Sequence, residues 1–116
     1  MNAPNALPVD RRFGSRGTLH TAGEHIRTVF AVGDSMRGDF DHGDPVLVNT
    51  ARREFDSDGV YCFRHSGVVQ IKRLQALGDG IVRILSTNPA YPPIDAPLDQ
   101  IEIGGRVIGA HTLREF

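Results

Sequence analysis

Residues 58–85 of this 116-residue chain read DGVYCFRHSGVVQIKRLQALGDGIVRIL. Three apolar runs in this stretch are separated by the turn sequences His-Ser-Gly and Gly-Asp-Gly; the runs are residues 60–64, 68–77 and 81–85. Short apolar runs bounded by Gly, Asp and Ser are typical of β-strands joined by tight turns. The stretch therefore predicts a three-stranded meander.

The sequence on both sides of the meander also consists of short apolar runs separated by turn residues. Apolar runs at residues 26–32 and 45–49 leave room for at most one helical turn between them. Residues 88–93 contain three prolines and should form a surface loop. The apolar pairs around Gly104-Gly105 predict two short strands or one strand with a bulge; they are Ile101 with Ile103 and Val107 with Ile108. We therefore expect a mainly β fold of about seven short strands.

The N-terminal 24 residues differ from the rest of the chain. They contain three glycines and two prolines and show no sustained period of 2 or 3.6 residues. We expect residues 1–24 to be a flexible arm or a linker remnant and residues 25–116 to form one domain. A chain of this length is too short for two domains with separate cores.

Composition excludes several classes of protein. The hydrophobic share of 40%, the charged share of 23% and the net charge of −1 are typical of a soluble globular domain. Because 13 basic residues are offset by 14 acidic ones, we do not expect DNA binding through bulk charge. No apolar run approaches the ~18–20 residues that span a bilayer, and the N-terminus lacks the apolar core of a signal peptide. We therefore expect a cytoplasmic protein with no membrane partner.

Metal and thiol chemistry are not expected either. The five histidines never fall at a metal-binding spacing; they are His20, His25, His42, His65 and His111. Asp39, Asp41 and Asp44 resemble a calcium loop only superficially and are better explained as turn residues. Cys62, the single cysteine, lies between two aromatic residues of an expected strand, where a small buried hydrophobe is the usual role.

One arrangement of residues has the requirements of nucleophilic catalysis. The sequence Gly33-Asp34-Ser35-Met36 directly follows an apolar strand, and Lys72 lies inside the apolar-rich run 68–77. A serine in a tight turn can present its Oγ beside free backbone N–H groups, which can form an oxyanion hole. On residue types alone, an alternative remains open: Ser35 caps a turn, and Lys72 extends into solvent at a strand edge.

Lys72 can act as a general base only when it is neutral. Its ordinary pKa of ~10.4 must fall by about three units, equivalent to about 4 kcal/mol, which burial away from water can supply. Strand alternation puts Lys72 on the same face as Val68, Leu74 and Ala76, which predicts apolar surroundings for the amine.

Six segments, in order, resemble the pattern of the C-terminal domains of LexA-like and phage repressors. These are the S24 peptidase-like domains, which are also seen in UmuD. The segments are residues 32–36 (VGDSM), 43–48 (GDPVLV), 58–61 (DGVY), 71–74 (IKRL), 86–92 (STNPAYP) and 105–107 (GRV). The resemblance extends from about residue 29 to residue 109, and the Ser35-to-Lys72 interval of 37 residues is similar to that of the family.

The resemblance implies a LexA/signal-peptidase-like β fold and the function of a repressor's C-terminal domain, which forms homodimers or higher homo-oligomers. It also implies a Ser-Lys dyad that cleaves the protein's own linker, usually when stimulated by RecA filaments on single-stranded DNA. Carried over to the matching positions, Ser35 is the nucleophile and Lys72 the general base. The backbone N–H groups of Asp34 and Ser35 are the oxyanion donors, and no metal or cofactor is implied.

The sequence departs from this family in two respects. Complete repressors carry a helix-turn-helix domain ahead of this module, which 24 residues cannot hold, so we expect DNA contact only through a missing N-terminal domain. Ala22-Gly23 matches the family's scissile bond in letters only. A strand over residues 26–32 would place its far end about 23 Å from Ser35, and residues 22–25 span at most about 14 Å. Cleavage by a second copy, or at an upstream site, remains open.

Three other functions are alternatives to the repressor interpretation. A non-catalytic dimerisation module is favoured by the absence of a recognisable cleavage loop. A UmuD-like accessory subunit of SOS mutagenesis also carries an arm in place of a DNA-binding domain. A membrane-bound signal peptidase uses similar Ser-Met and Lys motifs, but the sequence contains no transmembrane anchor.

Overall fold

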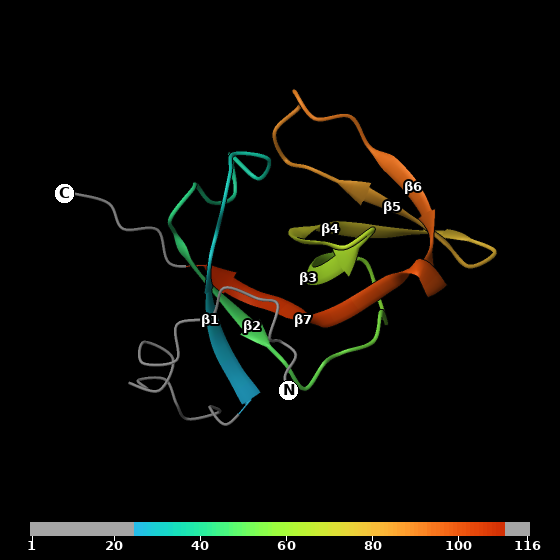
Figure 1. Ribbon diagram of the computed structural model, residues 1–116, viewed down its shortest axis with the longest axis horizontal. Coiled ribbons are helices and arrows are strands. Elements are labelled where there is room, and N and C mark those ends of the chain that lie inside the picture. Colours follow the sequence, from blue (N-terminus) through green and yellow to red (C-terminus); the bar gives the residue numbers. More distant parts are fainter. Residues whose placement is uncertain (1–24, 111–116) are drawn as a thin grey trace.

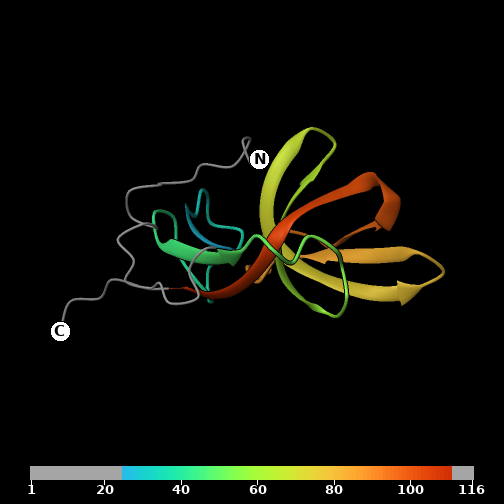
Figure 2. The same cartoon turned by 90° about the horizontal axis from the view of Figure 1, so that it is seen from below.

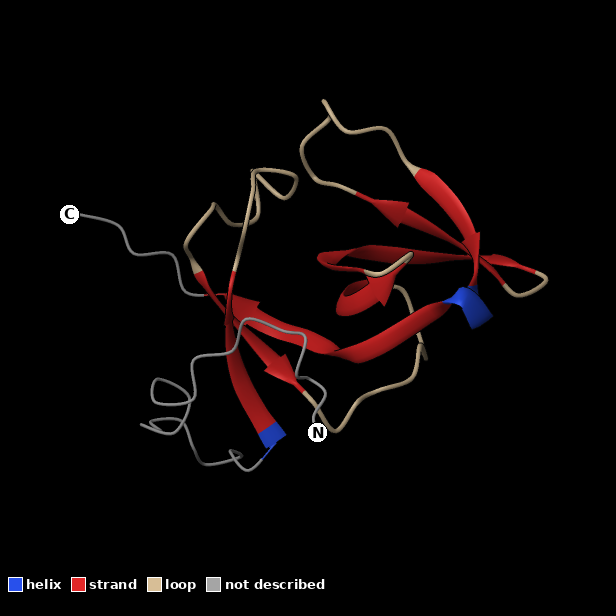
Figure 3. Ribbon diagram, viewed as in Figure 1, coloured by secondary structure: helices blue, strands red, loops and turns tan. Residues whose placement is uncertain are grey.

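The computed structural model describes residues 25–110 of the chain (Figure 1). The expected arm at residues 1–24, including Ala22-Gly23, lies outside the described residues, as do residues 111–116. Strands dominate this part of the chain (Figure 3), and the expectation of a mainly β fold is confirmed. No helix within residues 25–110 has the length and hydrophobicity needed to cross a bilayer.

Seven strands form one antiparallel sheet with the order β1-β2-β7-β3-β4-β5-β6. The strands are β1 (Ile26–Phe30), β2 (Pro45–Asn49), β3 (Gly59–His65), β4 (Val68–Gly78), β5 (Ile81–Leu85), β6 (Ile94–Pro97) and β7 (Ile101–Ala110). The 3-10 helix η2 (Leu98–Gln100) joins β6 to β7. Strands β3, β4 and β5 are the expected meander.

The turn between β3 and β4 shows why the meander could be expected. Ser66 and Gly67 have φ angles of 53° and 78°. Positive φ at both central residues is the geometry of the two-residue hairpin turn that matches the twist of paired strands. The turn fixes the register in which Tyr61 of β3 lies opposite Lys72 of β4.

Strand β7 joins two groups of strands, β1 with β2 on one side and β3 to β6 on the other. Its first half pairs with β3 and its second half with β2, and Figure 2 shows it crossing from one group to the other. The expected bulge lies at Gly104, because Cys62 pairs with Gly105 and Phe63 with Ile103. A Cβ atom on Gly105 would lie 2.8 Å from the carbonyl oxygen of Asn49, so the crossing requires a glycine here.

Two details of the strand assignment differ from expectation. Strand β1 ends at Phe30 rather than at residue 32. Ala31 still donates its N–H to the carbonyl of Asp44 (3.0 Å), but the chain then turns at Gly33, whose φ is 86°. Strand β6 was not expected, because its sequence IDAP is short and has no apolar run; it is held as an edge strand by pairing with β5.

Strand β3 is buried on both faces and separates two groups of core residues. Tyr61, Cys62 and Phe63 are each no more than 1% exposed. The first core consists of Val29, Ala31, Met36, Phe40, Val46, Val48 and Cys62. The second core consists of Tyr61, Phe63, Leu74, Val82, Ile84, Ala96 and Ile101. Because consecutive residues of β3 belong to different cores, this strand holds the first core, and the loop that packs on it, in a fixed position.

Candidate serine and lysine site

A pocket of about 320 Å³ opens beside the first core. Its wall is formed by β1, by the loop of residues 31–44 that we call the serine loop, by the start of β4 and by Tyr91. Ser35 and Lys72 both line this pocket, although 37 residues separate them in the chain. The two side chains that the sequence analysis singled out therefore lie in the wall of one pocket, and no hydrogen bond joins them in the structure.

Turn hydrogen bonds and two buried side chains fix the serine loop. Met36 and Phe40 are 3% and 7% exposed and belong to the first core. The N–H groups of Asp39 and Phe40 both donate to the carbonyl of Met36, at 2.9 and 3.1 Å. Ser35 directly precedes the buried Met36, so its backbone position follows from the packing of the core.

Before the serine, the loop turns at Gly33. The N–H of Gly33 donates to Nδ1 of His42 at 2.9 Å, and the positive φ of 86° suits a glycine. His42 is thus hydrogen-bonded to the start of the serine turn. No contact to the Ser35 hydroxyl is found for it within residues 25–110.

The carbonyl groups of Asp34 and Ser35 accept hydrogen bonds from other residues, whereas their N–H groups donate to no other residue within residues 25–110. The carbonyl of Asp34 accepts from the N–H of Arg37 (3.1 Å) and from Nδ2 of Asn88 (3.0 Å), and that of Ser35 accepts from the N–H of Asn88 (2.9 Å). Within residues 25–110 the N–H of Ser35 donates to no acceptor, and the N–H of Asp34 is directed at the carboxylate of its own side chain, whose pKa it helps to lower. Two N–H groups next to a hydroxyl are the elements of an oxyanion hole.

Lys72 is half-buried on β4 and is the single lysine among the 13 basic residues of the chain. Burial lowers the pKa of its ammonium from the ordinary value of 10.5. Within residues 25–110 its Nζ forms no hydrogen bond or ion pair and lies 5.6 Å from the ring centroid of Tyr91. The expected fall in pKa therefore has the right direction and the expected cause.

The expected surroundings of the amine were partly wrong. Leu74 is fully buried, but Val68 is 56% exposed and Ala76 is also exposed. Only the middle of β4 lies beneath other elements, because Val68 adjoins the β3–β4 turn and Ala76 lies near the β4–β5 turn. The serine loop and Tyr91 line the same pocket as Lys72, so segments distant in the sequence contribute to its surroundings.

The segment from Asn88 to Tyr91 contributes to the site in a way the sequence reasoning missed. The hydroxyl of Tyr91 donates to Oδ1 of Asp34 at 2.5 Å, across 57 residues of sequence. This bond is the largest cause of a lowered pKa for the Asp34 carboxyl. In the sequence, residues 88–91 stood out only as part of the family pattern. Their one local signal is the Asn-Pro turn, which predicts a loop but does not show that the loop contacts Asp34.

The remaining candidates behave as structural residues. Burial raises the pKa of Cys62 to about 12, and its thiol is fully enclosed by the first core, as expected. Oδ2 of Asp44 accepts from the N–H of Asp41 at 2.8 Å, as a turn residue does. In the part of the chain that the structure describes, no three His, Cys, Asp or Glu side chains are grouped so that they could hold a metal ion.

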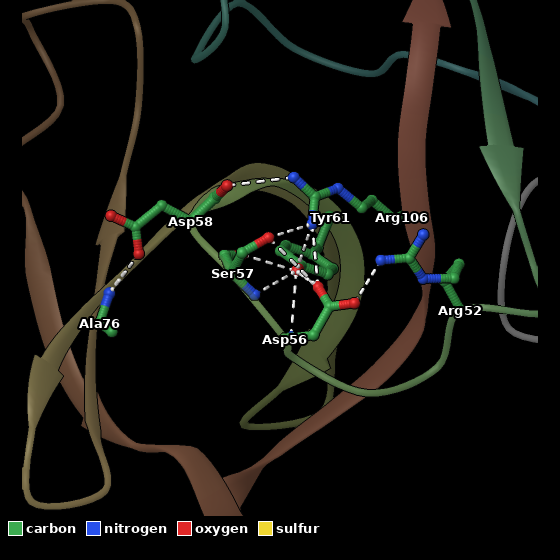
Figure 4. Close-up of polar contacts among 7 residues, drawn as sticks. All are labelled: Arg52, Asp56, Ser57, Asp58, Tyr61, Ala76 and Arg106. Atoms are coloured by element: carbon green, nitrogen blue, oxygen red, sulfur yellow. Dashed lines mark hydrogen bonds and ion pairs between the residues drawn. The ribbon is translucent and has the colours of Figure 1, made fainter.

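A second polar cluster closes the loop between β2 and β3 (Figure 4). Nη1 of Arg106 donates to Asp56 (3.0 Å), to Ser57 Oγ (2.7 Å) and to the hydroxyl of Tyr61 (3.1 Å), and Nη2 donates to the carbonyl of Asp58 (3.1 Å). The hydroxyl of Tyr61 in turn donates to the carbonyl of Ser57 at 2.7 Å. This cluster holds the β2–β3 loop against β7, and both terminal nitrogens of the Arg106 guanidinium donate hydrogen bonds within it.

Comparisons with known proteins identify the family of this chain and two of its relatives. The sequence profile of the Peptidase S24-like family matches residues 4–108. A 26 kDa repressor protein of Escherichia phage HK022 is 34% identical over 68 residues, which is 59% of this chain and 28% of the relative. An uncharacterized HTH-type transcriptional regulator of Haemophilus influenzae is 28% identical over 94 residues, which is 78% of this chain and 39% of the relative. The chain thus spans well under half the length of these relatives, and it belongs to the Peptidase S24-like family.

Proposed function

We propose that this chain is the C-terminal oligomerisation and self-cleavage domain of a phage-type or LexA-like transcriptional repressor, in which Ser35 is the nucleophile and Lys72 the general base. The observation that supports this most is the pocket that Ser35 and Lys72 line together, with a half-buried amine that has no acidic partner within residues 25–110. The two relatives support the repressor role, since one is a phage repressor and the other an HTH-type regulator.

The chemistry follows from the groups at the pocket wall. Neutral Lys72 takes the proton from Ser35 Oγ as the oxygen attacks the carbonyl carbon of the scissile peptide bond. The N–H groups of Asp34 and Ser35 donate to the developing oxyanion. When the C–N bond breaks, the Lys72 ammonium returns the proton to the leaving amine. Water then attacks the acyl-serine ester, giving one proton to Lys72, which passes it to Ser35 Oγ as the serine leaves.

The form of the substrate is inferred from the strands beside the pocket. Strand β1 comes first in the order of the sheet. Within residues 25–110, β4 pairs with β5 only from Arg73 onward, so one edge of residues 68–72 has no partner strand there. Residues from both strands line the pocket. An extended peptide can hydrogen-bond to such edges as an added strand, which would bring its backbone carbonyl to Ser35.

The proposed partners are those of a repressor. A second copy of the chain would form the dimer or higher oligomer, RecA filaments on single-stranded DNA would stimulate cleavage, and DNA would be bound by a segment other than this domain. Sedimentation of the purified chain at tens of micromolar tests the first proposal. A dimer is expected, and a monomer at that concentration would contradict the oligomerisation role.

The decisive experiment measures self-cleavage of the full-length gene product with increasing pH, because a lysine base becomes active as it loses its proton. Ser35→Ala removes the nucleophile, and Lys72→Arg keeps a cation that cannot serve as the base. Each variant is expected to lower the rate by about 10³-fold or more. Ser66→Gly, in the β3–β4 turn where φ is 53°, is the matched control and should cleave normally. Cleavage of the Ser35→Ala protein at the wild-type rate at alkaline pH would exclude the proposed chemistry.

A further inference from the structure

The loop between β5 and β6 is docked onto the serine loop. The backbone N–H and the side-chain amide of Asn88 hold the carbonyls of Ser35 and Asp34. The hydroxyl of Thr87 donates to Oδ2 of Asp39 at 2.7 Å. A Cβ atom on Gly38 would lie 2.9 Å from Cγ2 of Thr87, so the two loops are in close contact.

The same loop holds Tyr91 in place from within. The N–H of Tyr91 donates to the carbonyl of Asn88 (3.1 Å), and the N–H of Ala90 donates to Oδ1 of Asn88 (3.0 Å). Asn88 therefore fixes both the serine turn and the backbone that carries Tyr91. The position of Tyr91 relative to Ser35 is set by one side chain that bonds to both segments.

Tyr91 uses its two ends for different contacts. Its hydroxyl donates to Asp34 at 2.5 Å, and its ring lies 5.6 Å from Nζ of Lys72. The Asp34 carboxylate raises the pKa of the Tyr91 phenol, so the hydroxyl keeps its proton and remains a donor as the pH rises. Tyr91 is 41% exposed, and both it and Lys72 lie in the wall of the pocket, with the amine over the ring face.

The charged groups around Lys72 are already engaged elsewhere. On the serine loop, Asp34 is bonded to Tyr91 and paired with Arg37 at 3.4 Å. On β4, the adjacent Arg73 is paired with Asp39 at 3.8 Å. On β3, the hydroxyl of Tyr61, the cross-strand neighbour, belongs to the Arg106 cluster. Among residues 25–110, no carboxylate forms an ion pair with Lys72, so its protonation depends on how much water reaches it.

We propose that Tyr91 is a positioning residue of the Ser35 and Lys72 site: its ring shields the Lys72 amine from water while its hydroxyl holds Asp34 and the serine turn. This proposal rests on the function proposed above. It assigns to the Asn88–Tyr91 segment the task of coupling the two halves of the dyad. A ring face also attracts a cation, by about 0.5–1 kcal/mol at exposed sites. Burial acts in the opposite direction and lowers the pKa of Lys72.

Two substitutions separate the two tasks. Tyr91→Ala removes the ring and the hydroxyl, so water reaches Lys72 and its pKa should rise toward 10.5. We expect a rise of about half a unit or more. Tyr91→Phe keeps the ring and loses only the bond to Asp34. It should leave the pKa of Lys72 in place and lower the plateau rate of self-cleavage several-fold.

The single lysine makes the first measurement direct. Selective ¹³C labelling of lysine gives one side-chain ε-carbon signal, whose chemical shift is followed from about pH 7 to 11. Ile94→Ala on β6, where the side chain is 53% exposed and lies outside the pocket wall, is the matched control and should leave the midpoint unchanged. Backbone amide spectra verify that each variant is folded.

The outcomes distinguish this proposal from the proposed function. A higher lysine midpoint in Tyr91→Ala, together with an equal upward shift of the cleavage profile, supports both. A higher midpoint in a protein whose wild type does not cleave supports the shielding by Tyr91 and contradicts the peptidase role. An unchanged or lower midpoint in folded Tyr91→Ala overturns the proposal, whether or not the wild type cleaves. An unchanged plateau rate in Tyr91→Phe overturns the part assigned to the hydroxyl.

Discussion

The molecule uses the same set of side chains twice, with different results. In each case an aspartate is bonded to a tyrosine hydroxyl and paired with an arginine, and a cation lies over the tyrosine ring. The loop group is Arg52, Asp56 and Tyr61 beside Arg106, and the pocket group is Arg37, Asp34 and Tyr91 beside Lys72. The cations lie 5.2 and 5.6 Å from the ring centroids.

The two groups differ in what they leave unsatisfied. Tyr61 is fully buried and Arg106 donates to four acceptors, so the loop group is closed. Tyr91 is 41% exposed and Lys72 donates to no acceptor in the described residues. Arginine stays charged at all working pH values, whereas a half-buried lysine can lose its proton. The same arrangement thus stabilises the fold in one place and leaves a titratable amine in the other.

The largest expected effect on stability comes from breaking the loop group. Arg106→Ala removes four donated hydrogen bonds, leaves the Tyr61 hydroxyl without its cation and leaves Asp56 with Arg52 as its remaining cation. We expect the free energy of unfolding to fall by about 2–3 kcal/mol, since hydrogen bonds to charged groups are worth more than neutral ones. Denaturant unfolding of the purified chain measures this loss.

Arg64→Ala is the matched control for that measurement. Arg64 lies on β3 and pairs with Glu102 at 3.6 Å, but both side chains are well exposed. Its loss should be less than about 0.5 kcal/mol, as is usual for exposed ion pairs. If the two arginine variants lose similar amounts of stability, the Arg106 cluster does not have the structural role described here.

The sequence predicted those parts of the fold that depend on residues close together in the chain. The meander follows from turn residues that lie next to each other in the chain, such as Ser66 and Gly67 with their positive φ values. Strand β6 could not be predicted, because IDAP carries no period and forms a strand only by pairing with β5. The end of β1 depends on where residues 43 and 44 bond to Ala31, which is likewise a contact between distant segments.

For the candidate site, the sequence identified two side chains that line the pocket but not the residues that surround them. Ser35 and Lys72 were singled out by residue type, by local context and by a family resemblance. The contact between Tyr91 and Asp34 spans 57 residues and depends on the docking of two loops. The pattern of apolar residues in the sequence does not predict such a contact. The prediction of an apolar strand face around Lys72 was partly wrong for the same reason. Val68 of that face is exposed, and residues of other segments line the pocket beside the amine.

The second prediction concerns Asn88 and tests whether the pocket group depends on its loop. Asn88→Ala removes the bond to the Asp34 carbonyl and the bond from the Ala90 N–H. Stability should fall by about 1–2 kcal/mol. The rate of self-cleavage should fall about ten- to a hundredfold, because the serine turn is less well positioned.

Asn49→Ala is the matched control for Asn88→Ala. The side chain of Asn49 accepts from the N–H of Ala51 at 3.0 Å, as Asn88 does from Ala90, but it lies at the end of β2 and outside the pocket wall. Stability should fall by about 0.5–1.5 kcal/mol, with the cleavage rate unchanged. Equal losses of cleavage in the two variants would mean that the rate follows general stability rather than the position of the serine turn.

The smallest expected effect is a pH dependence that distinguishes the two aspartates. The bond from Arg52 is the main cause that lowers the pKa of Asp56 to about 2, from an ordinary 3.8. A carboxyl with a lower pKa in the folded chain contributes stability above pH 3.8, and this contribution is lost as the pH falls toward 2. Unfolding midpoints in urea, measured between these pH values, should fall less steeply with decreasing pH for Asp56→Asn than for the wild type.

Asp34→Asn should also make the unfolding midpoint less dependent on pH, but by less than Asp56→Asn does. The reason is that Tyr91, the partner of Asp34, is 41% exposed and not part of a closed cluster. If Asp34→Asn has the larger effect, the bond to Tyr91 is stronger than the whole loop group, and the contrast between a closed and an open cluster is wrong.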